Sequence, residues 1–259
     1  SGKLPDFSKE DTLLLSAYGV YWERGRRAMH NQDSVVLLQV LTARGRVLMA
    51  AVCDGMGGLE QGETASGYVT MRLQEWFYAS LLRAIRQRKA YWIIRRSLER
   101  LVYDMQEQLS RYAGQEEICL GSTMTVLVLW EKTYLLWHLG DSRACRVSAP
   151  GRGGDGRAGL HCMTTDHVRG RNQLTKCVGS FGFMRPDFKM GSFGTGQAFV
   201  LCSDGFRHCV TEQETADVLN PAVITEEAQA ERRLREIGEA CMKRGETDNL
   251  SAVYIKACR

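Results

Sequence analysis

The sequence lacks the features that would place it in several special classes of protein. Its 259 residues contain no apolar run of about eighteen residues, so no transmembrane helix is expected. The first residues, SGKLPDFSKEDT, lack the apolar core of a signal peptide. The formal net charge of +4 is too small to indicate binding to nucleic acid. We therefore expect a protein without a membrane span and without a nucleic-acid partner.

The nine cysteines do not form a recognisable motif. No two of them have C-x-x-C spacing, which argues against a zinc knuckle or a redox pair of that type. Cys53 and Cys202 lie in apolar runs that resemble strands, where a cysteine behaves as a small buried apolar residue. An odd number of scattered thiols is typical of a reducing compartment, and we expect a cytoplasmic protein.

What is present is enough for a large α+β core. Apolar residues make up 44% of the chain. Apolar, β-favouring runs predict strands, and a three-to-four-residue apolar repeat predicts two long helices within 62–114 that are interrupted near 87–90. The predicted strands are 13–22, 34–42, 46–54, 122–130, 133–140, 142–148, 197–205 and 249–257. A further helix is expected at 226–245, and the glycine-rich segment 166–196, which has little periodicity, is expected to be either a functional flap or disordered. Strands followed by helices and then by strands indicate antiparallel sheets covered by helices, and the absence of a repeat or linker indicates one domain over 1–259.

Two other segments allow more than one interpretation. The basic run RAIRQRKAYWIIRRSLER, residues 83–100, is either the solvated face of a helix pair or a docking surface. The glycine-rich segment 149–159 is not followed by a helical pattern, so it is predicted to be a hairpin loop and not a phosphate-binding loop.

His138 lies within a predicted strand and is expected to be a packed residue.

Five aspartates lie at the ends of predicted strands. They are Asp33, Asp54, Asp141, Asp204 and Asp248. Any one of them alone is most simply turn chemistry. If the strand ends converge, however, five carboxylates would repel one another unless a cation lay among them. Oxygen ligands suit Mg²⁺ and Mn²⁺, and two such ions close together activate water and clamp a phosphoryl group.

The glycines after Asp54 fit the same interpretation. Gly55 has no side chain, so its carbonyl oxygen is free to approach a metal ion. Gly57 and Gly58 are able to adopt turn conformations that other residues avoid.

Seven short motifs, in this order, resemble those of the metal-dependent PPM (PP2C-type) protein serine/threonine phosphatases in their compact bacterial form. The motifs are NQDS at 31–34, DGMGG at 54–58, GSTMT at 121–125, GDSRACR at 140–146, DH at 166–167, LCSDGF at 201–206 and DNLSAVY at 248–254. Together they cover the chain from about residue 13 to 257.

The resemblance implies a four-layer α-β-β-α sandwich with a dinuclear Mn²⁺ or Mg²⁺ site at one end of two antiparallel sheets. Asp54 would bridge both metals, Gly55 would offer its carbonyl oxygen to one, and Asp204 and Asp248 would hold the other. Asp141 would help to hold a third, weaker metal. Asp33 would orient the metal-activated water, and the flap at 166–194 would border the site.

Three positions depart from the family pattern. The arginine that grips substrate phosphate is expected five residues before Asp33, where this chain has Ala28. We assign that role to Arg27 and not to its neighbour Arg26, because alternate residues of an extended strand face opposite ways. Gln32 replaces a common glutamate, which predicts weaker metal binding, and Met56 stands where some relatives have a histidine proposed as general acid.

Two functions from different classes follow. The first is hydrolysis of phosphoserine and phosphothreonine in proteins, with phosphoprotein substrates, an opposing Ser/Thr kinase and a monomeric enzyme. The second is a catalytically weak or inactive module of the same fold that binds or senses. The presence of Asp54, Asp204 and Asp248 favours the enzyme, and the displaced arginine favours the alternative.

Overall fold

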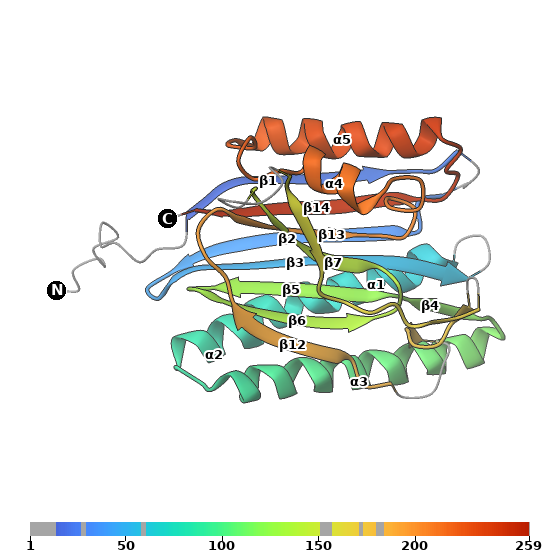
Figure 1. Cartoon of the computed structure of the whole chain (residues 1–259). Coiled ribbons are helices and arrows are strands. Elements are labelled where there is room, and N and C mark those ends of the chain that lie inside the picture. The colour runs from blue at the N-terminus through green and yellow to red at the C-terminus, as the bar shows by residue number, and fades with distance from the viewer. Residues whose placement is uncertain are drawn as a thin grey trace.

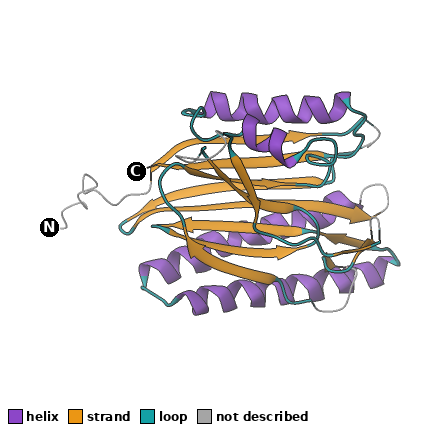
Figure 2. Cartoon of the chain, viewed as in Figure 1, coloured by secondary structure: helices purple, strands orange, loops and turns teal. Residues whose placement is uncertain are grey.

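Two antiparallel sheets stack face to face, and helices cover both outer faces of the stack (Figures 1 and 2). The structure is a computed structural model that describes residues 14–26, 30–57, 61–150, 157–170, 173–179 and 184–258. Helices α4 and α5 lie over one sheet, and α1 to α3 lie over the other (Figure 1). This arrangement confirms the α-β-β-α sandwich that the resemblance implied.

The two sheets divide the strands as follows. The first has the order β1-β14-β13-β7-β8, and the second has the order β11-β4-β3-β5-β6-β12, with β2 paired to β3. The strands are β1 (Leu14–Glu23), β2 (Asp33–Thr42), β3 (Gly45–Gly57), β4 (Leu120–Ser122), β5 (Met124–Trp130), β6 (Thr133–Leu139), β7 (Arg143–Ser148), β8 (Gly159–Cys162), β9 (Val168–Arg169), β10 (Gln173–Leu174), β11 (Val178–Gly179), β12 (Asp187–Ser192), β13 (Gln197–Cys202) and β14 (Leu250–Cys258). The short strands β9 and β10 pair separately with each other.

The helices are α1 (Gln61–Trp76), a π-helical turn η1 (Phe77–Leu81), α2 (Leu82–Arg86), α3 (Tyr91–Glu116), α4 (Glu212–Val218) and α5 (Glu227–Lys243). The expected interruption near 87–90 is confirmed, because Arg88 has a positive φ of 54° and Ala90 is extended. Helix α4 was not predicted, although Thr211 and Glu214 form a capping box at its start, which is a helix-start signal readable in sequence. None of the described helices combines the length and apolarity needed to cross a membrane.

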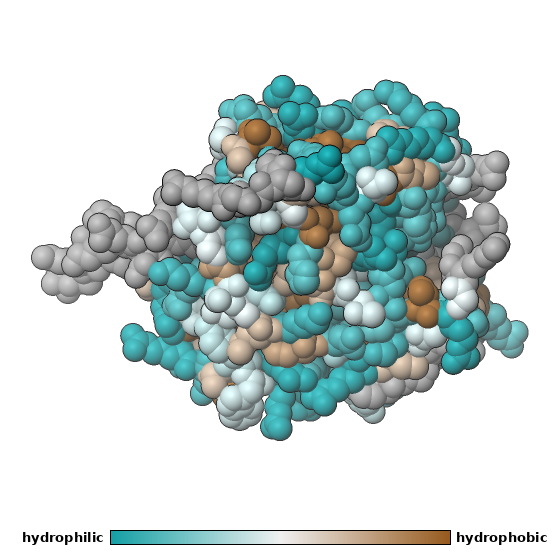
Figure 3. Space-filling model, in the orientation of Figure 1, coloured by the Kyte–Doolittle hydropathy of each residue, from teal (hydrophilic) through white to brown (hydrophobic). Residues whose placement is uncertain are grey.

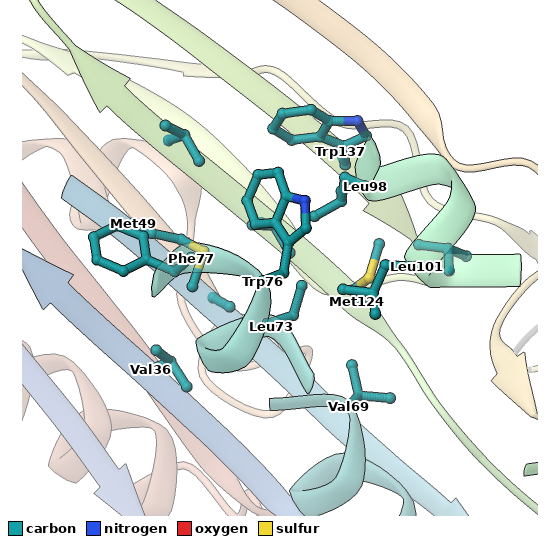
Figure 4. Close-up of a cluster of buried hydrophobic side chains, with 14 of the residues drawn as sticks. Val36, Met49, Val69, Leu73, Trp76, Phe77, Leu98, Leu101, Met124 and Trp137 are labelled. Atoms are coloured by element: carbon teal, nitrogen blue, oxygen red, sulfur yellow. The ribbon is translucent and has the colours of Figure 1, made fainter. Parts of the chain in front are cut away.

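Strand β3 explains the nearly continuous apolar run before Asp54. Successive side chains of a strand point to opposite faces. Met49 and Ala51 therefore pack against the helices α1 to α3, whereas Leu48 and Ala50 pack between the two sheets. Figure 4 shows the helix-covered cluster, in which Trp76 of α1 meets Trp137 of β6 edge-on at 6.0 Å between ring centroids. As predicted, β3 is buried on both faces.

The predicted flap is more regular than expected at its C-terminal end. Residues Asp187–Ser192 form β12, which pairs in full register with β6 and extends the second sheet. The flap range of 166–194 therefore includes an ordinary edge strand, and this part of the prediction is wrong. The apolar alternation of the segment DFKMGS is too weak to predict a strand. The segment becomes a strand because it pairs with β6, about fifty residues earlier in the chain.

The predicted hairpin over 149–159 lies partly outside the described residues, but β7 and β8 on either side of it pair antiparallel as expected. In the basic run, Arg95 pairs with Glu99 at 2.7 Å and Arg96 lies over the ring of Trp92, as in a solvated helix face. Arg83, Arg86 and Arg88 line an open pocket of about 640 Å³, and the docking interpretation stays a prediction. On the face shown in Figure 3, hydrophilic residues dominate and apolar ones form scattered patches.

Candidate active site

Two of the five aspartates face each other directly across a strand pair. Asp33 begins β2 and is paired in register with Asp54 of β3. The backbone of Asp54 is held from the other side by Thr123, whose Oγ1 accepts from Asp54 N and whose N donates to Asp54 O, both at 2.8 Å. The sequence predicted that this strand ends at Asp54. In the structure, β3 continues to Gly57 by pairing with β4. Asp54 therefore sits on a rigid part of the sheet.

Asp204 and Asp248 come from the other sheet. Strands β13 and β14 are antiparallel neighbours with Cys202 opposite Ala252. Asp204 follows the end of β13 and Asp248 precedes the start of β14, so both lie at the same end of these two strands. Glu246 fixes the second of these turns, because its Oε1 accepts from the backbone N of Thr247 at 2.7 Å and of Asp248 at 3.0 Å.

Asp141 lies in the link between β6 and β7, and so connects the two sheets. The guanidinium of Arg207, three residues after Asp204, donates to the carbonyl oxygen of Asp141 at 3.2 Å. Arg143, at the start of β7, lies opposite Cys202 in the ladder between β7 and β13. The link is therefore tied to the turn that carries Asp204.

The electrostatics show that these aspartates share one region. Burial raises the pKa of Asp33 to about 7, and the negative charges of Asp248 and Asp204 contribute to the rise. The hydroxyls of Ser251 and Ser203 partly oppose it. They lie near the carboxylate, but neither oxygen of Asp33 has a hydrogen-bond partner of good geometry.

The other carboxylates are perturbed in the same direction. Burial raises the pKa of Asp54 well above its usual value, and the charges of Asp33, Asp204, Asp248 and Asp141 raise it further. Burial and the charge of Asp204 raise the pKa of Asp141 to about 6, against the opposing charge of Arg207. Burial and Asp204 also raise the pKa of Asp248. The structure thus brings together all five aspartates that the sequence singled out.

Several buried oxygens of the site have the chemistry of ligands for a divalent cation. Both carboxylate oxygens of Asp33 and the Oδ1 atom of Asp204 are buried without a hydrogen-bond partner. Buried carboxylate oxygens are costly when unpaired, and a cation or its water shell satisfies them. Within the described part of the chain, however, no three His, Cys, Asp or Glu side chains are already arranged to hold a metal ion. The donor chemistry fits a hard cation, whereas the individual ligand roles stay predictions.

Glycines allow the backbone of β3 at Gly55 to approach the start of α1 closely. A side chain at Gly62, in the first turn of α1, would meet that oxygen at 2.6 Å. A side chain at Gly55 would in turn collide with the carbonyl oxygen of Gly62. The close approach of β3 to the start of α1 therefore requires glycine on both sides, a contact that sequence reasoning about Gly55 did not include.

The beginning of the predicted flap is anchored by two arginines. Arg143 grips Asp166 with two hydrogen bonds of 2.9 and 2.8 Å, and Arg207 adds a third at 3.1 Å. Burial alone would raise the pKa of Asp166, but the hydrogen bond from Arg143 and the charges of both arginines lower it. Asp166 is thus an ion-pair anchor that connects the flap to the turn of Asp204.

Sequence reasoning missed several side chains around the site. His208 lies between Asp204 and Glu246, with nitrogen-to-oxygen distances of 3.6 and 3.5 Å. Asn249 accepts a hydrogen bond at 2.8 Å from the backbone of Gln32, which ties the loop before β2 to the start of β14. The spacing of His208, four residues after Asp204 in the turn DGFRH, was the available signal.

Arg27 and Ala28 lie outside the described residues. Arg26 is described and exposed, but β1 ends at Glu23. The strand alternation used to choose Arg27 over Arg26 therefore does not apply, and that part of the reasoning is wrong. The assignment of Arg27 rests on the resemblance alone.

Fold and site together define a class of protein: an α-β-β-α sandwich with clustered carboxylates at one end of its sheets. Residues 23–239 match the family model described as Protein phosphatase 2C. Because this match spans most of the chain, the chain belongs to the protein phosphatase 2C family. The predicted family and enzyme class, a protein serine/threonine phosphatase, are confirmed.

Named relatives agree with this membership. The serine/threonine phosphatase stp of Listeria welshimeri serovar 6b is 23% identical over 218 residues, which cover 76% of this chain and 80% of the relative. PppA, a key regulatory component of T6SS in Pseudomonas aeruginosa, has a similar structure, with a TM-score of 0.73, 24% identity and coverage of 94% of this chain and 99% of that one. The catalytic domain of the phosphatase PstP, in complex with two manganese ions, gives a TM-score of 0.72 at 22% identity, with coverage of 96% and 100%. The two structures show the shared fold.

Proposed function

We propose that this chain hydrolyses phosphoserine and phosphothreonine in proteins at a site that holds two Mn²⁺ or Mg²⁺ ions. The observation that carries the proposal is the convergence of five aspartates from two sheets on one region, where oxygens of Asp33 and Asp204 are buried without partners. The manganese-containing PstP structure supports the choice of metal.

Each residue of the proposed site has a separate role in holding the metal ions or orienting the attacking water. Asp54 would hold both ions, the carbonyl oxygen of Gly55 would hold one, and Asp204 and Asp248 would hold the other, while Asp141 would serve a third, weaker position. When bound, the ions would supply an activated water and would neutralise the charge of the phosphoryl oxygens. Asp33 accepts a hydrogen bond from the attacking water and so orients it. The water oxygen would form the new bond to phosphorus, the bond from phosphorus to the seryl or threonyl oxygen would break, and that oxygen would leave with a proton supplied by water.

The remaining assignments belong to the same proposal. Arg27 binds the substrate phosphate, phosphoproteins are the substrates, and a Ser/Thr kinase opposes the enzyme. We propose one domain, supported by three apolar clusters that share the same two sheets, and a monomer. A cytoplasmic location is supported by the free cysteines among the described residues.

Two observations favour the alternative of a catalytically weak or inactive module. Among the described residues, three acidic, His or Cys side chains do not yet converge on one metal position, and Met56 replaces the histidine of some relatives. A module of this kind would keep the fold and bind without turnover.

The deciding experiment measures hydrolysis of a phosphothreonine peptide and of an aryl phosphate with Mn²⁺, with Mg²⁺ and after chelation. We expect activity that chelation abolishes and either metal restores. Asp54→Asn is expected to lose on the order of 100-fold or more in turnover, because the bridging carboxylate is removed. Asp217→Asn, exposed on α4 away from the site, is the matched control and should keep full activity.

Activity that survives exhaustive chelation would contradict the metal mechanism. Absence of turnover under every condition, in a folded protein that still binds Mn²⁺, would favour the inactive module.

A further inference from the structure

Two cysteines that are distant in sequence face each other at the edge of the first sheet. Cys145 of β7 is paired in register with Cys162 of β8, and their Sγ atoms are 2.8 Å apart. Among the described residues, both are free thiols. The absence of C-x-x-C spacing excluded a redox pair only along the sequence, and the β7–β8 hairpin creates one in space.

The position of the pair in the ladder suits a disulfide. The next pair along the ladder, Ala144 and Met163, is joined by a backbone hydrogen bond of 2.8 Å from Met163 N to Ala144 O. Pairs alternate along an antiparallel ladder, so Cys145 and Cys162 form a non-hydrogen-bonded pair, whose Cα atoms lie about 4.5 Å apart. A disulfide requires Cα atoms about 4.4–6.8 Å apart. The bond is therefore able to form with little backbone movement.

A small pocket gives access to the two sulfurs. It has a volume of about 90 Å³, and Arg143, Cys145, Cys162, Cys202 and Glu212 are among its lining residues. This volume is ample for a molecule slightly larger than water, whose share of liquid volume is about 30 Å³. Cys162 is partly exposed, whereas Cys145 is only 3% exposed.

The pKa values of the two thiols are shifted in opposite directions. The hydrogen bond from Cys145 and the charge of Arg143 lower the pKa of Cys162 to about 7, against the effect of burial. The same hydrogen bond and burial raise the pKa of Cys145. Since the thiolate is the reactive form, Cys162 is the more nucleophilic partner and Cys145 is placed to resolve its oxidised form.

We propose that Cys145 and Cys162 are a peroxide-reactive thiol pair that forms a reversible disulfide between β7 and β8. The Cys162 thiolate attacks one oxygen of hydrogen peroxide, the O–O bond breaks, and the departing hydroxide takes up a proton to become water. The Cys145 sulfur then attacks the sulfenic acid at Cys162, which forms the S–S bond and releases a second water. Two thiols lose two electrons and one peroxide is reduced to two waters.

The bond would act on the edge of the sheet beside the active site. Strand β8 is the edge strand of its sheet, and the chain reaches Asp166 four residues after Cys162. Arg143, which lines the thiol pocket, also grips Asp166. Oxidation therefore places a covalent tie at the start of the flap segment, independently of whether the chain is an active phosphatase.

The test uses the full chain, reduced, desalted and treated with hydrogen peroxide. We expect the loss of two thiols, a mass decrease of about two hydrogens, and a Cys145–Cys162 linked peptide in a non-reducing digest, all reversed by dithiothreitol. Closing this loop should raise the melting temperature by about 2–8 °C. In Cys145→Ser, a dimedone adduct should form at Cys162, whereas Cys162→Ser should form no linked peptide.

Cys119→Ser is the matched control, because Cys119 is an exposed cysteine that is not among the residues lining the pocket. It should form the disulfide as the wild type does. A link from either cysteine to Cys202, or oxidation of Cys119 while Cys145 and Cys162 stay reduced, would overturn the proposal.

Discussion

Among single residues, His138 and His167 show how the fold buries groups that would carry charge in water. Their rings stack with centroids 4.8 Å apart. His138 Nδ1 lies 3.0 Å from Thr125 Oγ1, and its Nε2 lies 3.1 Å from the carbonyl oxygen of Thr165. The expectation that His138 is a packed residue is confirmed, and its partners join β5, β6 and the segment before Asp166.

Burial and the neighbouring His167 lower the pKa of His138 to about 4. In the unfolded chain this pKa is about 6.5, so between about pH 6.5 and 4 the unfolded chain binds a proton that the folded chain excludes. His138 therefore favours folding above pH 6.5, and this contribution is lost as the pH falls, by up to about 3 kcal/mol.

The measurement compares urea unfolding of wild type and His138→Asn at several pH values. From pH 7 to pH 4.5, the free energy of unfolding should fall more steeply for the wild type than for His138→Asn. His161→Asn, exposed on β8, is the control and should follow the wild type. Parallel curves for wild type and His138→Asn would contradict the assignment.

Arg27 carries the proposed grip on substrate phosphate. Loss of one charge-assisted hydrogen-bonding group costs about 1.5–3 kcal/mol, or about ten- to a hundredfold in affinity. Arg27→Ala should therefore raise KM for an aryl phosphate by about that factor and change kcat less. Arg26→Ala should have little effect, because the resemblance assigns the phosphate contact to a single arginine, which we take to be Arg27. A KM penalty carried by Arg26 and not by Arg27 would move the assignment by one residue, and no effect in either variant would place the phosphate grip elsewhere.

At the scale of elements, the approach of β3 to the N-terminal turn of α1 shapes the site. Gly55 and Gly62 touch through their backbones, and the hydroxyl of Ser66, one turn further along α1, donates to the carbonyl oxygen of Gln32 at 2.6 Å. The helix start, the loop before β2 and the strand that carries Asp54 are thereby fixed to one another.

Gly55→Ala should therefore destabilise the fold. Its added Cβ would collide with the carbonyl oxygen of Gly62 and would meet that of Gln32 at 2.6 Å. Overpacking of this kind costs about 1–3 kcal/mol. The matched control is Gly67→Ala within α1, where an added Cβ meets nothing within 4 Å. Alanine at this position should stabilise the helix by about 0.5–1 kcal/mol. Thermal unfolding of both variants checks this, and equal melting temperatures would show that β3 and α1 are free to move apart.

Across the whole molecule, negative charge is concentrated at the site although the formal net charge is +4. The carboxylates of both sheets raise one another's pKa values. Their mutual repulsion destabilises the folded chain unless a cation binds among them. Binding to the folded chain alone then stabilises it by mass action.

Mn²⁺ at about 100 times its dissociation constant should raise the melting temperature by about 5–10 °C over the chelated protein. Scanning calorimetry with and without chelator measures the shift without reference to activity. Asp54→Asn should lose most of it, and Asp217→Asn should keep it. An equal shift in Asp54→Asn would place the bound metal elsewhere.

Much of this architecture was predictable because its causes are local. The burial of both faces of β3, the interruption before α3 and the apolar stripe of α5 follow from residue patterns and turn chemistry within short windows. Asp33, Asp54, Asp141, Asp204 and Asp248 were identifiable because each adjoins an apolar strand. The start of helix α4, which was not predicted, is also marked by a local signal, the capping box of Thr211 and Glu214.

By itself, the sequence determined which residues alternate in strands, where helices break and which carboxylates lie at strand ends, because a few neighbouring residues decide these properties. Only the tertiary structure decided which of these groups meet. The pairing of Asp33 with Asp54 needs the register of β2 and β3, and the pairing of Cys145 with Cys162 needs that of β7 and β8. Strand β12 exists because β6 offers it a partner. Such contacts depend on chain segments that close long loops, and their burial and charge arise only when the layers pack together.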